Sequence, residues 1–315
     1  MNHRPDKAFK LEPLCHELQA ELLRVRQIRN FNPEEYLFLK IESIKEYFEE
    51  HRLKAAVLGM SGGVDSAVVL GILREFKRKY PNAIKQIYPI CLPVNETFAI
   101  GHEKSQLRVI EQCRLWDMEY RVINLGAIHT AIRNVFPPTT PWANGQLVSN
   151  IRTPMLYHQA TISTAAGVPA IVAGTTNRDE GAYLGYVGKV SDGMVDLQLI
   201  ADLHKSEVYK LADCLGVCQG ILEAVPAGEM YDGRVDEEVF GATYDFVELY
   251  LNHLCENWCP EGYPAHWSEK ACAQYDTLST NIEALHRYNS HKYLVGSPAV
   301  HLNVLPSAVP GGWRE

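Results

Sequence analysis

One stretch, residues 55–73, limits the fold of this 315-residue chain more than any other. It opens with an apolar run at 55–58, which is typical of a strand buried inside a parallel sheet. The sequence Gly-Met-Ser-Gly-Gly-Val-Asp-Ser follows at 59–66, and a second apolar run at 67–73 predicts a helix. A strand, a glycine-rich turn and a helix in this order present free backbone N–H groups and a positive dipole end to an anion. The stretch therefore predicts a phosphate-binding turn.

The side chains of this turn suit a phosphate ligand. Gly62 and Gly63 have no Cβ atom, so the backbone can approach phosphate oxygens closely. Ser61 and Ser66 add hydroxyl donors, and Asp65 places a carboxylate where a divalent cation can balance phosphate charge. No lysine follows the glycines and the spacing is not Gly-x-Gly-x-x-Gly, so two common nucleotide-binding loops are excluded. The alternative interpretation is an ordinary strand-to-helix turn with a serine cap.

Short apolar runs alternate with helical patterns through the next hundred residues. Further strands are predicted at 86–92, 119–125 and 168–174, separated by helices at 103–116, 128–135 and 154–166. This alternation predicts an α/β fold, a doubly wound parallel sheet with helices on both faces. Extra helices are expected towards both ends, at 14–26, 202–215, 236–256 and 268–288, and residues 137–145 are expected to form a loop. Ligands of such sheets bind at the carboxyl ends of the strands, where 59–66 and 174–180 both lie.

Composition narrows the class of protein. The net charge of −8 and the pI near 5.9 argue against a nucleic-acid-binding surface. No window is apolar enough to span a membrane, and the N-terminus lacks the apolar region of a secretory signal. The eight cysteines contain no Cys-x-x-Cys pair and are expected to be free thiols. We expect a cytoplasmic protein that binds neither nucleic acid nor membrane.

The turn Ser-Gly-Gly-Val-Asp-Ser resembles the pyrophosphate-binding loop of the N-type ATP pyrophosphatases. A second set of residues narrows the resemblance to the NAD synthetase family: Gly174, Thr175, Glu180, Lys189, Asp192, Gly193, Asp196 and Lys205. The segments Ala-Thr-Tyr-Asp-Phe at 242–246 and His-Lys at 291–292 resemble later parts of that family. The resemblance implies an adenine-nucleotide α-hydrolase-like fold, and a single domain over residues 1–315 whose core runs from about 35 to 292.

The resemblance also implies a role for each matching residue. The ATP contacts are expected at Gly59, Ser61, Gly62, Gly63, Val64, Asp65, Ser66, Thr175 and Lys205. Asp65 and Glu180 would hold Mg²⁺, and Asp65 and Lys205 are the expected catalytic residues. The dinucleotide substrate would contact Arg152, Lys189, Asp196, His291 and Lys292. Asp179 and Asp192 are interpreted as loop acids without a ligand.

Two positions depart from the family pattern. The family usually has Asn-x-x-x-Arg before the fourth strand, whereas Arg152 is displaced by about two positions from that arginine. A hydroxyl residue often follows a proline near ATP, whereas this chain has Ala227 after Pro226. The displacement of Arg152 affects the expected contact with the carboxylate substrate. Ala227 has no hydroxyl, so only backbone contacts with ATP are expected at that position.

The implied activity is ATP-dependent amidation of nicotinic acid adenine dinucleotide (deamido-NAD) to NAD. The reaction passes through an acyl-adenylate, takes ammonia as nitrogen donor and releases AMP and pyrophosphate. No region of the size of a nitrilase-like glutaminase is present, so free ammonia or a separate subunit is expected to supply nitrogen, and the resemblance implies a homodimer. Three alternatives stay open: a paralogue that amidates a different small carboxylate, a tRNA-thiolating enzyme, and a nucleotide-binding regulator without catalysis.

Overall fold

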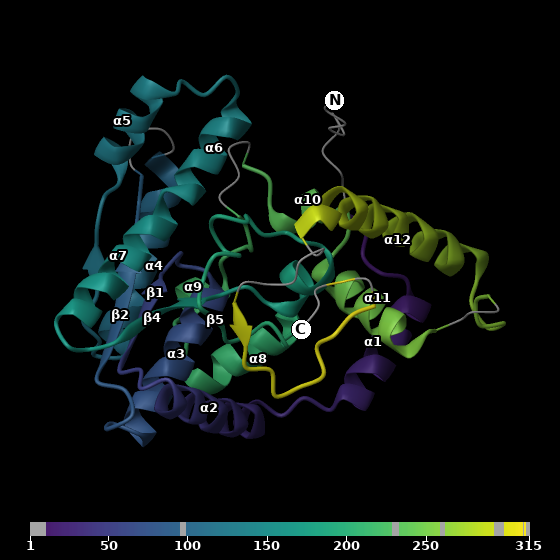
Figure 1. Cartoon of the computed structure of the whole chain (residues 1–315). Coiled ribbons are helices and arrows are strands. Elements are labelled where there is room, and N and C mark those ends of the chain that lie inside the picture. Colours follow the sequence, from purple (N-terminus) through teal and green to yellow (C-terminus); the bar gives the residue numbers. More distant parts are fainter. Residues whose placement is uncertain are drawn as a thin grey trace.

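The computed structural model describes residues 11–94, 99–228, 233–258, 262–292, 299–310 and 312. Its centre is a parallel sheet with the strand order β3-β2-β1-β4-β5-β6 (Figure 1). The strands are β1 (Ala55–Gly59), β2 (Gln86–Cys91), β3 (Arg121–Val122), β4 (Ala170–Gly174), β5 (Leu197–Gln198) and β6 (Val300–His301). The chain winds outward from β1 to β3 and then returns to place β4 on the other side of β1. The predicted doubly wound α/β fold is therefore confirmed.

Helices cover both faces of this sheet. They are α1 (His16–Arg29), α2 (Pro33–Glu50), α3 (Val64–Lys79), α4 (Ala99–Leu115), α5 (Gly126–Val135), α6 (Pro141–Asn150), α7 (Arg152–Ala165), α8 (Lys205–Leu215), α9 (Gln219–Leu222), α10 (Asp236–Phe240), α11 (Tyr244–Glu256) and α12 (Glu269–Asn289). A π-helical turn, η1 (Asp179–Tyr183), and a 3₁₀ turn, η2 (Ser290–Lys292), complete the described helical elements.

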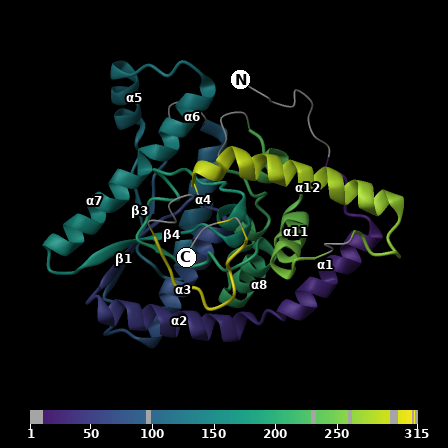
Figure 2. The same cartoon turned by 45° about the vertical axis from the view of Figure 1, so that its right-hand side comes forward.

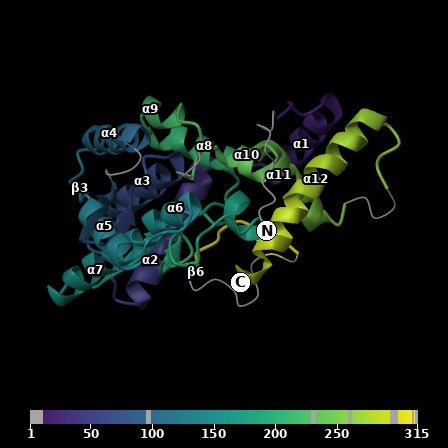
Figure 3. The same cartoon turned by 90° about the horizontal axis from the view of Figure 1, so that it is seen from above.

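The alternation of side chains along β1 explains the two layers. Ala56 and Leu58 point into a core shared with α2, α3 and α8, whereas Val57 points into a core with α6 and α7. All three side chains are fully buried, as expected for a central parallel strand. The positions of the helices around the sheet can be followed in Figures 1 and 3. Because β1 is fixed on both faces, the turn that follows it is held firmly.

A second hydrophobic core lies beside the sheet. It joins α1, α10, α11 and α12 to η1 through buried side chains such as Leu18, Phe246 and Ile282. Figure 2 shows α1 and α11 side by side, and the two helices are in contact. Among the described residues no helix combines the length and the apolar character that crossing a membrane requires. That the two cores form a single domain stays a prediction.

The C-terminal segment is tied to the sheet by a buried carboxylate. Asp202 accepts hydrogen bonds from Lys40 Nζ at 3.1 Å and from the backbone nitrogen of Val304 at 2.8 Å. The side chains of Lys40 and Asp202 are both completely buried. This ion pair links α2, the start of α8 and the tail that carries β6.

Several expected elements differ in the structure. The expected loop at 137–145 is partly helical, because Thr140 caps α6 and Pro141 occupies its first position. The expected helix at 236–256 is divided in two by Gly241, whose φ of +64° ends α10. The strands β5 and β6 were not predicted from the sequence, and each contains only two residues.

Candidate functional site

The glycine-rich turn follows β1 and leads directly into α3. Gly62 has a φ of +80°, and a Cβ atom at this position would lie 2.4 Å from the backbone oxygen of Ser105. Arg108 Nε donates to the carbonyl of Gly62 at 2.8 Å. Gly63 is the residue that precedes the first turn of α3. The turn thus requires glycine at 62 both for its backbone conformation and for its close contact with α4.

Two serine hydroxyls stabilise the turn from within. The backbone nitrogen of Gly63 donates to Ser61 Oγ at 3.2 Å, and Ser66 Oγ donates to the carbonyl of Gly63 at 3.0 Å. The two hydroxyl oxygens lie 3.2 Å apart. Val64 is buried in the core and anchors the start of α3, whereas Gly59 ends β1 against the side chain of Leu156. The predicted loop residues therefore form one compact turn at the carboxyl end of β1.

A second segment brings Glu180 and Lys205 to this turn. Lys205 is the first residue of α8, and its Nζ lies 2.7 Å from Asp65 Oδ2 and 3.0 Å from Glu180 Oε1. The side-chain amide of Asn177 donates to the same two carboxylates, at 2.9 and 2.8 Å. Asp65 and Glu180, expected to act together, therefore lie side by side.

A third carboxylate completes the group. Tyr244 OH lies 2.8 Å from Glu180 Oε1 and 3.0 Å from Asp236 Oδ2, and Tyr186 OH donates to Asp236 Oδ1 at 3.0 Å. A phenol has only one proton to donate, so Tyr244 satisfies both carboxyl groups only when one of them is protonated. Tyr244 Oη therefore connects the α10 carboxylate to the site.

Burial dominates the ionisation of these groups. It raises the pKa of Glu180 to about 7, an effect that Lys205 opposes and Asp65 reinforces. Burial also raises the pKa of Asp236, again against the effect of Lys205. Burial by itself lowers the pKa of Lys205, but Asp65 and Glu180 outweigh it and raise this pKa. The lysine is therefore a permanent cation, and burial favours the protonated forms of Glu180 and Asp236.

A cavity of about 550 Å³ opens beside these residues. Its walls come from the glycine-rich turn, the segment after β4, α4 and the connection between α9 and α10. The side chains named above that line it belong to Ser61, Asp65, Arg108, Glu180, Tyr186, Lys205 and Asp236. Pro226 and Ala227 also line it, in the connection between α9 and α10. Cations, carboxylates and tyrosines thus share one solvent-accessible wall.

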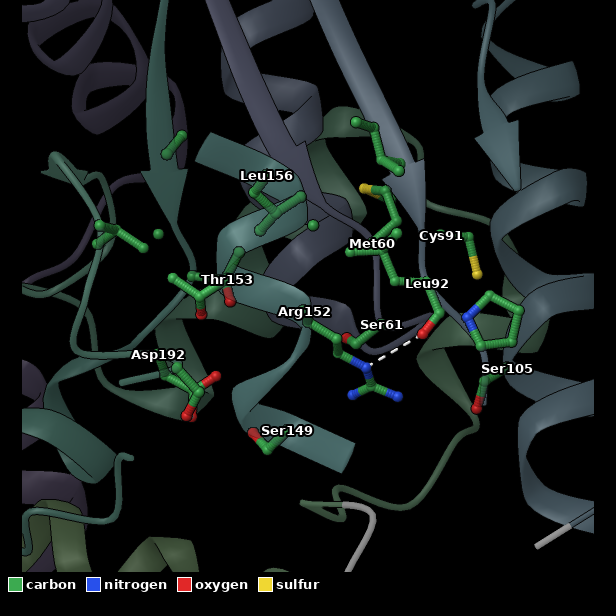
Figure 4. Close-up of a pocket in the computed structure, with 18 of the residues that line it drawn as sticks. Met60, Ser61, Cys91, Leu92, Ser105, Ser149, Arg152, Thr153, Leu156 and Asp192 are labelled. Carbon is green, nitrogen blue, oxygen red and sulfur yellow. Dashed lines mark hydrogen bonds between the residues drawn. The ribbon is translucent and has the colours of Figure 1, made fainter. Parts of the chain in front are cut away.

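A smaller, mainly apolar pocket of about 120 Å³ adjoins this cavity, with which it shares Ser61, Arg152, Thr175 and Asp192. Figure 4 shows Met60, Leu92 and Leu156 on one side of it and the guanidinium of Arg152 near Ser61. Arg152 Nε donates to the carbonyl of Leu92 at 3.2 Å, the dashed line in the figure. A flat apolar group with polar atoms at its edge fits such a pocket.

Two of the expected dinucleotide contacts, His291 and Lys292, lie in η2, and His291 is exposed. Loss of hydration lowers the pKa of His291, and the charges of Lys189 and Lys292 lower it further. Lys292 Nζ donates to the carbonyls of Gly185 and Val187 at 2.7 and 2.6 Å. Asp192, which lines both cavities, favours the charged form of Lys292 against the effect of burial. Asp192 therefore lies at both cavities, and its interpretation as a loop acid without a ligand stays a prediction.

Asp196 has a different environment. Its carboxylate accepts from the backbone nitrogen of Val172 at 2.7 Å and from Tyr157 OH at 3.2 Å. It is absent from the described walls of both cavities and supports the edge of β4 instead. A substrate contact by Asp196 stays a prediction.

Sequence reasoning missed four contributors to the site. Asn177, Tyr186, Asp236 and Arg108 carry no recognisable motif by themselves, although Asn177 lies three residues before Glu180. Asp179, interpreted as a loop acid, is fully buried and accepts from the backbone nitrogen of Lys205 at 2.7 Å. The polar run Thr-Thr-Asn-Arg-Asp-Glu directly follows an apolar strand, and this pattern could have indicated these site residues. Polar residues at the carboxyl end of a parallel strand lie where ligands of such sheets bind.

Comparison with known proteins agrees with this geometry. A model of the NAD synthase family matches residues 38–294. An NH₃-dependent NAD⁺ synthetase from Alkaliphilus oremlandii is 31% identical over 264 residues, which cover 80% of this chain and 91% of the relative. One from Methanococcoides burtonii is 30% identical over 218 residues, 68% of this chain and 77% of the relative.

Solved structures show the same fold. The NMN synthetase of Francisella tularensis superposes with a TM-score of 0.66 at 22% identity, over 83% of this chain and 96% of that one. The NH₃-dependent NAD synthetase of Campylobacter jejuni gives a TM-score of 0.61 at 22% identity, with the same coverage of both chains. With the family match over most of its length, the chain belongs to the NAD synthase family.

Proposed function

We propose that this chain is an ammonia-dependent synthetase that converts deamido-NAD to NAD at the expense of ATP. The observation that carries the proposal is the meeting of three separate segments at one cavity wall. These are the glycine-rich turn with Asp65, the η1 turn with Glu180 and the start of α8 with Lys205. Membership of the family and relatives named NH₃-dependent NAD⁺ synthetases support the same activity.

The phosphates of ATP bind at the turn. The backbone N–H groups at the start of α3 face anions, and Ser61 supplies a hydroxyl at the cavity wall. The purine occupies the apolar pocket between Met60, Leu92 and Leu156, which shares a wall with the phosphate site. Thr175 lines both cavities, so it lies where the base and the phosphates join.

The donor set at this wall also suits Mg²⁺. Magnesium is usually held by one or two carboxylates together with phosphate oxygens, and Asp65 and Glu180 provide two adjacent carboxylates. Bound Mg²⁺ supplies charge neutralisation of the triphosphate. When ATP binds, Lys205 turns from the carboxylates to the phosphates and carries its positive charge with it.

Catalysis follows from positioning and charge. The substrate carboxylate attacks the α-phosphorus, its new P–O bond replaces the bond to pyrophosphate, and an acyl-adenylate forms. Lys205 and the amide groups of the turn stabilise the negative charge that develops on the leaving pyrophosphate. Ammonia then attacks the activated carbonyl, AMP leaves with the C–O electron pair, and the nitrogen loses a proton to solvent. Arg152, Lys189, His291 and Lys292 hold the dinucleotide in this scheme.

An assay with purified protein tests the proposal. Deamido-NAD, ATP, Mg²⁺ and ammonium are mixed with the protein, and NAD and pyrophosphate are measured separately. Both products are expected, and removal of ammonium should stop NAD formation. A parallel reaction with nicotinic acid mononucleotide tests the other carboxylate, because one structural neighbour is an NMN synthetase. Absence of NAD and pyrophosphate from the first mixture rejects the proposal.

The proposal also covers the oligomeric state and the cellular location of the enzyme. A homodimer places the dinucleotide near the contact between copies, and sedimentation analysis tests this. We also propose a cytoplasmic location, where ATP and ammonium are available.

A further inference from the structure

Asp179 and His204 form a fully buried pair between the two segments that deliver Glu180 and Lys205. Neither side chain is exposed to solvent. His204 Nδ1 lies 2.5 Å from Asp179 Oδ1, and the backbone nitrogen of Lys205 donates to Asp179 Oδ2 at 2.7 Å. Each member of the pair is therefore adjacent in sequence to one member of the Glu180–Lys205 contact.

The neighbours of His204 fix its tautomer. Asn252 Nδ2 lies 3.2 Å from His204 Nε2 and also donates to the carbonyl of Glu248 at 2.8 Å. A carbonyl only accepts, so the nitrogen of the Asn252 amide must face both partners. His204 Nε2 is then the acceptor, and Nδ1 carries the proton that is donated to Asp179. Both carboxylate oxygens of Asp179 consequently accept from a fixed donor.

The two segments have another connection nearby. The backbone nitrogen of Arg178 donates to the carbonyl of Leu203 at 2.8 Å. Arg178 directly precedes Asp179 and Leu203 directly precedes His204, so this bond lies next to the Asp179–His204 pair. The side chain of Glu207 accepts from the backbone nitrogen of His204 at 2.9 Å, which stabilises the start of α8. Neither of these bonds involves the backbone nitrogen of Lys205, and within the described part of the chain its acceptor is Asp179.

We propose that Asp179 is a positioning residue, which joins His204 to the backbone of Lys205 and so holds the Lys205 ammonium at the Asp65–Glu180 carboxylates. The residue acts through Lys205 and touches no substrate. The catalytic consequence rests on the proposed function, since Lys205 is assigned to ATP there. The geometric consequence, the location of Nζ, does not depend on that assignment.

The donor and acceptor groups of Asp179 and His204 determine which substitutions test the proposal. Asp179→Asn keeps the size but replaces one acceptor by an N–H donor, which must face either His204 Nδ1–H or Lys205 N–H. His204→Asn places an amide nitrogen close to the position of Nδ1 and keeps a donor for Asp179. His204→Gln places its amide near Nε2 and leaves Asp179 without that donor. The two histidine variants are therefore matched controls for each other.

The kinetic experiment compares these variants in ATP–pyrophosphate exchange. Displacement of a catalytic group by about 1 Å can cost about 100-fold, so a loss of that order is expected in kcat for Asp179→Asn. The KM for ammonium, measured in the complete NAD-forming reaction, should stay unchanged. In the exchange assay His204→Asn should lose far less than His204→Gln. Combining Asp179→Asn with Lys205→Met should cost no more than Lys205→Met alone, because both changes remove the same function. Additive losses, or equal losses in both histidine variants, would overturn the proposal.

A crystal structure of Asp179→Asn provides a test that needs no activity. Lys205 Nζ is expected to leave hydrogen-bonding distance of Asp65 or Glu180 in the variant while the fold persists. If Nζ keeps both contacts, the positioning role is refuted even when the protein is an active synthetase. If Nζ moves and the wild-type protein makes no NAD, the proposed function fails and the positioning role stands.

Discussion

The carboxylates of Asp65 and Glu180 are connected twice in this structure, once through the ammonium of Lys205 and once through the side-chain amide of Asn177. Asp65 belongs to the helix after β1, and Glu180 to the turn after β4. In a parallel sheet the carboxyl ends of neighbouring strands lie at the same edge, so residues distant in sequence become neighbours there. The ammonium nitrogen of Lys205 and the amide nitrogen of Asn177 can only donate, so each links the two carboxylates.

Replacing Asp65 by asparagine tests its charge. The amide keeps the size of the side chain but has no negative charge for a divalent cation. We expect ATP–pyrophosphate exchange to fall by about 100-fold or more, the usual effect of losing one group that stabilises transition-state charge. Circular dichroism should show an unchanged fold. Asp213→Asn, at an exposed position of α8, is the control and should retain full activity. Unchanged exchange in Asp65→Asn would contradict the role of this carboxylate.

Alanine at Gly62 tests the close packing of the turn. Gly62 and Gly216 both have positive φ, +80° and +72°, but a Cβ atom meets a backbone oxygen only at Gly62. Both variants should lose about 1–2 kcal/mol of stability from the left-handed conformation. Only Gly62→Ala should also weaken ATP binding, by about tenfold for each 1.4 kcal/mol of strain in the turn. Calorimetric titration with ATP distinguishes the two, and equal affinities in both variants would show that the turn tolerates a side chain.

The buried Lys40–Asp202 pair should matter far more for stability than an exposed pair. Lys40→Met leaves the Asp202 carboxylate buried without its cation, which typically costs about 3–5 kcal/mol. Lys45→Met removes a partly exposed partner of Glu49 on the same helix and should cost about 0.5 kcal/mol or less. Urea unfolding measures both free energies. Tyr36 OH also donates to Asp202 Oδ1 at 2.7 Å. A similar small loss in each variant would mean that Tyr36 and the backbone donors alone satisfy Asp202.

Acid should destabilise the fold through His253. Burial lowers its pKa from 6.5 to about 4, and the nearby Glu21 opposes this only in part. Between these values the unfolded chain binds more protons than the folded one, so the free energy of unfolding falls as pH falls from 6.5 towards 4. From pH 7 to pH 5 the loss from this residue is about 2 kcal/mol.

The variant His253→Gln isolates this contribution. Its free energy of unfolding should change less between pH 7 and pH 5 than that of the wild type, by about 2 kcal/mol. Urea unfolding at the two pH values gives the comparison. Burial also lowers the pKa of His204 to about 3, and this contribution is the same in both proteins. Equal changes in the two proteins would rule out a neutral His253 in the folded state.

The sequence predicted those parts of the molecule that local chemistry specifies. The run at 55–58 is apolar at every position, so its burial in a parallel sheet could be recognised without knowing its neighbours. The glycine turn was equally clear, because Gly62 and Gly63 serve the backbone rather than a distant partner. The two-residue strands β5 and β6 had no such signal, since their pairing depends on where the rest of the chain places them.

The same distinction between local and distant determinants separates the site residues that the sequence predicted from those that it missed. Asp65 could be recognised from its turn, whereas Asp236 reaches the site only because Tyr244 and Tyr186 hold it there. The role of Asp179 depends on a backbone nitrogen in another segment, which no local pattern reveals. The division of 236–256 at Gly241 was available in principle, because a glycine followed by Thr243 is a helix stop and a new helix start.

The position of β1 between β2 and β4 has a consequence for how the protein is made. The ribosome delivers the glycine turn long before it delivers Glu180 and Lys205, and the chain must reverse its winding direction to bring them together. A nascent or truncated polypeptide that stops before β4 therefore carries half of a nucleotide receptor. On the proposed function, capture of ATP is thus a sign that the chain extends past Lys205, and immobilised nucleotide should separate such chains from shorter fragments.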